Sequence, residues 1–140
     1  MSLDIHRAAL QPVKDALAAI PVQTVPPVSP IPADRLYYNR RPNDPALPHA
    51  FMRSENTAAG RSALGVEFDA FLSFDAWCRN REEIEAVRKA MLFLHGHSVG
   101  SQGTAYRIVY RLNSQNVITE PDSLHLSMLW VCTYLEQSGL

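Results

Sequence analysis

The chain has 140 residues, of which 46% are apolar and 19% charged, a balance typical of one soluble globular domain. A domain of this length buries roughly 68% of the surface of its unfolded chain, so it can hold a core without disulfides or a structural metal. Thirteen basic and fourteen acidic residues leave a formal charge of −1, which argues against overall attraction to nucleic acid or to an acidic membrane.

The N-terminal segment MSLDIHRAAL lacks the basic start, the apolar run and the cleavage site of a secretory signal. No stretch reaches the roughly 18 apolar residues that a membrane helix requires. We therefore expect a cytosolic protein with no membrane partner. In that compartment Cys78 and Cys132 stay reduced and serve as small core residues.

In residues 3–20, apolar side chains recur three, four or seven positions apart, which predicts an amphipathic N-terminal helix, kinked at Pro12. Five of the ten prolines fall in residues 21–32, so this segment should run as an extended connector. We expect a single domain over residues 1–140, in which the helix and the connector precede a body of sheet and helix at 34–136.

The body begins with two short segments of strand character, 35–38 and 49–54, on either side of a proline-rich loop. The strongest strand pattern follows at 64–78, where apolar residues occupy every second position. This alternation predicts a long strand with one face in the core.

A second helix is predicted at about residues 80–95. Asn80 is a suitable N-cap, Glu83 stands three positions later as in a capping box, and Gly96 should end the helix. A loop is expected from His95 to Thr104.

Two more alternating strands, 106–112 and 124–134, are joined by a long connection over residues 113–122. The order of elements predicts an α+β fold: a mainly antiparallel sheet of about four to five strands, packed with the N-terminal helix and the second helix.

Few residues suggest catalysis or metal binding. His95 and His97 could share a metal ion. A zinc site needs three or four ligands, however, and the nearby sequence has no further thiolate or carboxylate at a familiar spacing. Cys78 falls on the apolar face of its strand, where burial makes a thiol unreactive. The carboxylates of Glu67 and Asp69 fit a solvated strand face better than an acid–base pair. We expect no enzyme, no cofactor and no metal site.

Eleven of the thirteen basic residues are arginine, and Arg40, Arg41 and Arg61 lie in predicted loops. Arginine pairs bidentately with carboxylates and phosphates, so these residues suit a protein interface as well as nucleic acid. Without net positive charge or interleaved aromatic residues, recognition of DNA is the weaker interpretation.

The second face of the predicted sheet is unusually apolar, because Phe71 and Trp77 fall on it. A sheet face in contact with water should be mostly polar. Either a helix of the same chain covers this face, or it is the contact surface for another subunit.

Several segments together resemble the small tail-completion proteins of long-tailed bacteriophages, also called tail terminators or head-tail joining proteins. The resemblance covers about residues 3–136. The segments are ALAAI at the end of the first helix, Arg35-Leu-Tyr-Tyr, Pro48-His-Ala-Phe-Met after the proline-rich turn, the long strand to Trp77, the helix EEIEAVRKAMLFL, and Asp122-Ser-Leu-His-Leu.

The resemblance implies a structural protein of the virion tail or neck, made in the host cytoplasm. Members of the family form a ring, usually a hexamer, at the head-proximal end of the tail tube. The ring stops growth of the tube and docks on the head connector, and DNA passes through its lumen. The implied partners are further copies of the chain, the tail-tube protein and the head connector or stopper protein.

A closed ring requires two different complementary patches on each subunit. We expect a basic side and an acidic side, with two aromatic residues contributing apolar area. The candidates are Arg40, Arg41 and Arg61 for the basic side, Glu67, Asp69 and Asp75 for the acidic side, and Phe71 and Trp77. Two alternatives remain open: another neck or minor tail protein, or a small metal- or ligand-binding α+β domain that uses the His95–Gly103 loop.

Overall fold

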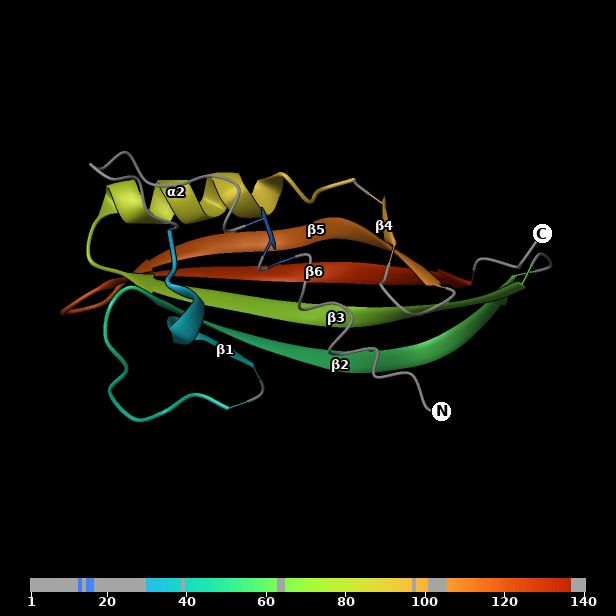
Figure 1. The fold of residues 1–140 in the computed structure, drawn as a ribbon, viewed down its shortest axis with the longest axis horizontal. Helices are drawn as coiled ribbons and strands as arrows, with labels where there is room; N and C mark the ends of the chain where they lie inside the picture. Colours follow the sequence, from blue (N-terminus) through green and yellow to red (C-terminus); the bar gives the residue numbers. More distant parts are fainter. Residues whose placement is uncertain are drawn as a thin grey trace.

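The computed structural model describes residues 13, 15–16, 30–38, 40–62, 65–96, 98–100 and 106–136. They form an α+β fold in which a helix packs on one face of a six-stranded sheet (Figure 1). The elements in chain order are the 3-10 turn η1 (Ala33–Arg35), β1 (Leu36–Tyr38), β2 (His49–Ser62), β3 (Gly65–Cys78), α2 (Arg81–Leu92), β4 (Ser98–Gly100), β5 (Tyr106–Thr119) and β6 (Leu124–Glu136).

The sheet is mixed, with the strand order β1-β2-β3-β6-β5-β4. β1 runs parallel to β2, with Leu36 opposite Ala50, and every other pair of neighbouring strands is antiparallel. A parallel pair needs a crossover connection, which the proline-rich segment between Tyr38 and His49 provides. The expected α+β class is confirmed. The sheet, expected to be mainly antiparallel with about four to five strands, is mixed because of the β1–β2 pair and has six strands.

Among the described residues, α2 is the one continuous α-helix. Most of the predicted helix at 3–20 and of the connector at 21–32 lies outside the described residues. Val13, Asp15 and Ala16 have helical backbone, and the side chains of Val13 and Ala16 are buried in the core.

Several strands extend beyond their predicted limits. β2 continues to Ser62, through a sequence of low strand propensity, because it pairs with β3 along its length and absorbs a register shift between Asn56 and Ala59. β5 continues to Thr119 across a register shift between Leu112 and Ser114, which interrupts the alternation used to find it. The predicted 113–122 connection is therefore wrong: only residues 120–123 separate β5 from β6. Part of the predicted loop after α2 forms the edge strand β4.

α2 begins at its predicted cap. The Asn80 side chain accepts a hydrogen bond of 2.9 Å from the Glu83 backbone N–H. The Glu83 carboxylate reaches back one residue further than in a capping box, because it accepts from the backbone N–H and the guanidinium of Arg79. The helix ends at Leu92, earlier than predicted. Gly96 follows with φ +76° and donates its N–H to the carbonyl of Tyr110 at 2.8 Å.

The core lies between α2 and one face of the sheet. Even-numbered residues of β3 and β6 supply most of its strand side, as the alternation predicts. The core residues are Ala50 and Met52 of β2, Leu72, Phe74, Ala76 and Cys78 of β3, Ile84, Val87, Ala90 and Met91 of α2, Ile108 and Tyr110 of β5, and Leu126, Met128, Trp130 and Cys132 of β6, together with Val13, Ala16, Ile31 and Leu94. Among the described residues, no helix has the length and apolar character needed to cross a membrane.

Candidate functional site

The sheet face opposite α2, here called the front face, carries the odd-numbered residues of the central strands. The register places His49, Trp77 and His125 side by side on β2, β3 and β6. Further along the strands, the described front-face side chains are Tyr37, Phe51, Arg53, Phe71, Ser73, Asp75, Arg111, Ser114, Asn116, Ile118, Ser127, Leu129 and Val131.

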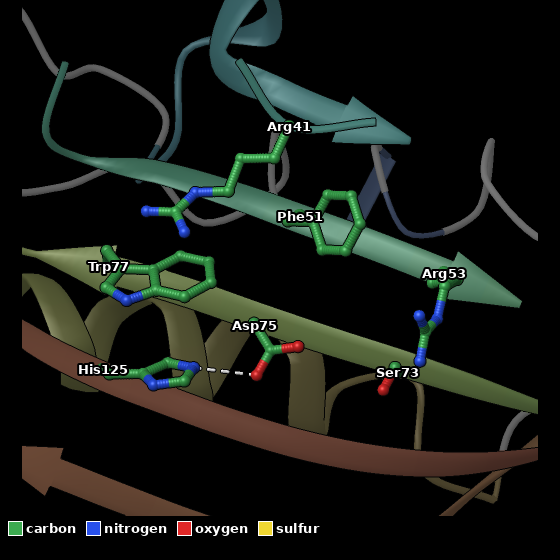
Figure 2. A pocket seen from close by; sticks show the side chains of 7 residues that line it. All are labelled: Arg41, Phe51, Arg53, Ser73, Asp75, Trp77 and His125. Carbon is green, nitrogen blue, oxygen red and sulfur yellow. Dashed lines mark hydrogen bonds and ion pairs between the residues drawn. The ribbon is translucent and has the colours of Figure 1, made fainter. Parts of the chain in front are cut away.

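A shallow pocket of about 320 Å³ opens on this face (Figure 2). Its walls are Arg41 from the loop after β1, Phe51 and Arg53 from β2, Ser73, Asp75 and Trp77 from β3, and His125 from β6. Residues two apart on a strand point to the same side, and cross-strand partners lie level with one another, so three neighbouring strands build the floor. The loop carries Arg41 over the edge of the floor.

Trp77 stands in a row of near-parallel rings at one end of the pocket. The centroid of His49 lies 5.0 Å from that of Trp77 with an interplanar angle of 15°, and His125 lies 4.3 Å away at 14°. Tyr37 continues the row beyond His49, with its ring tilted by 57° at 6.2 Å. Such cross-strand aromatic contacts stabilise a sheet and hold the indole in one orientation.

Arg41 links the loop to this row. Its guanidinium carbon lies 3.9 Å from the ring centroid of Trp77, within the range of a cation–π interaction. Its Nε donates to Nε2 of His49 at 3.2 Å. The loop that carries Arg41 is also held by Arg35, which donates to the carbonyl of Leu47 at 3.0 Å.

The ring of His49 is held in its neutral form. Because Nε2 accepts from Arg41, the ring proton resides on Nδ1, which donates to the carbonyl of Ala46 at 3.3 Å. Burial, followed by the positive charge of Arg41, holds the pKa of His49 below its ordinary value. The ring is therefore a structural support for Arg41 and Trp77.

His125 lies between two carboxylates. Its Nε2 is 2.8 Å from Oδ1 of Asp75 in the pocket, and its Nδ1 is 3.3 Å from Oε1 of Glu120 in the turn before β6. A doubly protonated imidazole donates to both groups, and a singly protonated one donates to only one of them. Asp75 is thus engaged from within the molecule.

The pocket combines two exposed guanidinium groups, on Arg41 and Arg53, with the apolar surfaces of Phe51 and Trp77. Its carboxylate, on Asp75, is already paired with His125. This chemistry is suited to binding a group that brings negative charge together with apolar surface.

The structure brings Arg41, Asp75 and Trp77 together in the pocket and places Phe71 further along the same face. Arg40 is exposed in the loop beside Arg41. Arg41 and Asp75 were expected on two different patches of the subunit, but in the structure both line one pocket.

Three other predicted residues lie in the distal halves of β2 and β3. Arg61 belongs to β2, opposite Val66, and not to a loop as predicted. Glu67 is opposite Leu135 and Asp69 is opposite Thr133 on β6. Their side chains lie outside the part that the structure describes.

The sequence interpretation did not assign His49, Phe51, Arg53, Glu120 or His125 to the site. Each of them lies in an alternating segment or beside a turn, so the alternation already indicated on which face of the sheet the strand residues lie. What was missing was the register that sets His49 and His125 beside Trp77, since strand pairing joins segments far apart in the chain.

The alternative site at His95 has a structural use. Nδ1 of His95 accepts the backbone N–H of Leu112 at 2.9 Å, and the ring lies 6.4 Å from that of Trp130. His97 and residues 101–105 lie outside the described residues. Within the described ones, no group of three or more His, Cys, Asp and Glu side chains is placed to hold a metal ion.

Family models give no match, and curated proteins provide no relative.

Proposed function

We propose that this protein is a non-enzymatic structural subunit that assembles into a ring at the head-proximal end of a bacteriophage tail tube. The ring stops tube growth and joins the tube to the head connector, as in the tail-terminator family that the sequence resembles. The observation that carries this proposal is the chemical character of the front face.

Part of the front face, around Phe71, Leu129 and Val131, is more apolar than a sheet surface that contacts only water. Phe71 is 39% exposed and Ile118 is 40% exposed, while Phe51, Leu129 and Val131 are partly buried on the same face. Antiparallel sheets with a solvated side carry polar residues there, and contiguous exposed apolar surface marks a contact site. Arg41 and Arg53 supply charged groups beside this surface, as is common at protein interfaces.

Four of the segments that carry the family resemblance meet at one end of the sheet. Arg35-Leu-Tyr-Tyr leads into and forms β1, which pairs with the start of β2 formed by Pro48-His-Ala-Phe-Met. Trp77 and Asp122-Ser-Leu-His-Leu come together where His125 stacks on the indole. These segments surround the pocket, which supports a shared role for them in contacts between subunits.

The charge balance suits a ring with DNA in its lumen. The chain carries −1 overall. A strongly basic lumen would retain DNA through contacts with many phosphates, whereas a near-neutral one lets DNA slide.

Mass photometry and negative-stain microscopy of the purified protein, alone and with tail-tube protein, test the proposal. We expect closed rings, and tubes that stop growing when the protein binds to one end. Tube protein polymerised alone is the control for length. If the protein stays monomeric at all concentrations and leaves tube length unchanged, the proposal is wrong.

A further inference from the structure

We infer that the ring closes through a front-to-back contact, in which the front face of one copy packs against the outer side of α2 in the next copy. This inference rests on the proposed function and names the surfaces that form the ring interface.

The first support is the position of exposed apolar side chains on two opposite sides of the molecule. Among the described residues, the large exposed hydrophobic side chains are Phe71, Ile118, Leu92 and Phe93. Phe71 and Ile118 lie on the front face, whereas Leu92 and Phe93 lie at the C-terminal end of α2, on the other side of the sheet. A ring with one repeated contact needs two such patches that face different ways.

The outer side of α2 carries exposed side chains, at Glu82, Glu85, Lys89 and Leu92. The helix packs on the sheet through Ile84, Val87, Ala90 and Met91, so the side chains between them point away from the core. Along that outer side the exposed residues are acidic at Glu82 and Glu85, basic at Lys89, and apolar at Leu92 and Phe93. Arg88 is half-buried and forms an ion pair of 3.5 Å with Glu85. Arg81, also exposed, begins the helix.

The front face shows the complementary order along β3. Arg41 lies over Trp77 at the end of the strand, Asp75 follows, and Phe71 comes last, with Arg53 level with Ser73 between Asp75 and Phe71. The front is thus basic at Arg41, acidic at Asp75, basic at Arg53 and apolar at Phe71, so its two ends complement the acidic start and the apolar end of α2.

The two series also run in the same direction and over similar lengths. α2 begins beside the end of β3 and runs back alongside the strands (Figure 1). From Trp77 to Phe71 the strand covers about 20 Å, and from Glu82 to Leu92 the helix covers about 15 Å. In a ring whose axis runs roughly along the strands, the front face of one copy therefore meets α2 of the next copy. Arg41 of the first copy then lies near Glu82 and Glu85 of the second, and Phe71 of the first lies near Leu92 of the second.

Crosslinking with single cysteines tests this geometry. The variants are Phe71→Cys on the front, Leu92→Cys on α2, and Asp122→Cys in the turn before β6 as a matched exposed control. A short bis-maleimide is added to the assembled protein, in which the native Cys78 and Cys132 are buried. Phe71→Cys mixed with Leu92→Cys should give covalent dimers, and the double variant should give a ladder up to the full ring.

Each single variant alone, and Asp122→Cys mixed with Leu92→Cys, should give no covalent dimer. Rings that form but crosslink through Phe71→Cys alone, or fail to crosslink in the mixture, overturn the front-to-back contact and leave the proposed function standing. A protein that forms no ring under any condition overturns both.

A charge exchange provides a second test that does not alter Phe71 or Leu92. Arg41→Glu should weaken assembly by about tenfold or more, because it places like charges opposite Glu82 and Glu85. Combining it with Glu82→Arg should restore assembly, while Lys89→Glu, which adds negative charge elsewhere on α2, should not. Equal assembly in the Arg41→Glu variant with and without Glu82→Arg contradicts the contact.

Discussion

Trp77 owes its fixed orientation to residues from three other parts of the chain. His49 and His125 flank its ring, and the Arg41 guanidinium lies over it. An indole held in this way presents a rigid surface, so little conformational entropy is lost when a partner binds against it. At the scale of single residues, the row of rings makes this part of the front face rigid.

The neutral state of His49 makes stability depend on pH. Burial and Arg41 lower the pKa of His49 in the folded protein, so the unfolded chain takes up a proton at a higher pH than the folded one. The contribution to stability is complete above about pH 6.5, the ordinary value for histidine, and is lost as the pH falls through the folded pKa.

We expect the free energy of unfolding, from urea titrations, to be lower at pH 5.5 than at pH 7.5. His49→Gln, whose side-chain oxygen can still accept from Arg41, should flatten this dependence. A variant as sensitive to pH as the native protein would show that His49 is not the group responsible.

At the scale of elements, α2 is defined by its first turn. Asn80 caps the helix, and Glu83 is held by Arg79. Burial would raise the pKa of the Glu83 carboxyl, but the hydrogen bonds from the side chain and backbone of Arg79 outweigh it and keep this pKa below its usual value. The charged carboxylate thus anchors the chain at the sheet-to-helix junction.

Removing the cap should destabilise the protein measurably. Asn80→Ala loses the bond to the Glu83 N–H, and we expect a decrease of about 1 kcal/mol in the free energy of unfolding. Asn80→Ser is the matched control, since its hydroxyl can accept the same bond and should retain most of the stability. Indistinguishable urea midpoints for Asn80→Ala and the native protein would contradict this role.

The elements differ in how far they could be predicted. The strand ending at Cys78 and the helix after Asn80 follow from alternation, capping and periodicity, which are local signals. The extensions of β2 and β5 do not follow from local signals, because pairing with neighbouring strands overrides weak local propensity.

The same limit applies to the candidate site. The front-face position of Trp77 and the involvement of Arg41 were predictable, since alternation and a proline-rich loop place them. The stacking of His49 and His125 on Trp77 depends on register, and the pairing of Asp75 with His125 depends on it as well. Distances between strands are therefore what the structure adds to the sequence pattern.

At the scale of the whole molecule, the single core protects both cysteines. Cys78 is fully buried, and burial, with the nearby charge of Glu83, raises the pKa of its thiol to about 12. Cys132 is 1% exposed in the same core. Neither thiol is accessible unless the sheet and α2 separate.

We therefore expect both thiols to react with iodoacetamide only as fast as the molecule unfolds globally, as measured by mass spectrometry of the intact protein. Labelling should accelerate for both cysteines together when urea is added, and stoichiometric labelling of free cysteine in the same buffer is the control. Rapid labelling of either thiol under native conditions would contradict a closed core.

The strand order has a consequence for how the chain reaches its folded state. β2–β3 and β5–β6 are hairpins of neighbouring strands, whereas the central β3–β6 pairing joins strands on either side of α2 in the sequence. Pairing between distant segments requires closure of a long loop and slows folding. The β2–β3 and β5–β6 hairpins dock along the seam between β3 and β6, so we expect this docking to be the slow step of folding.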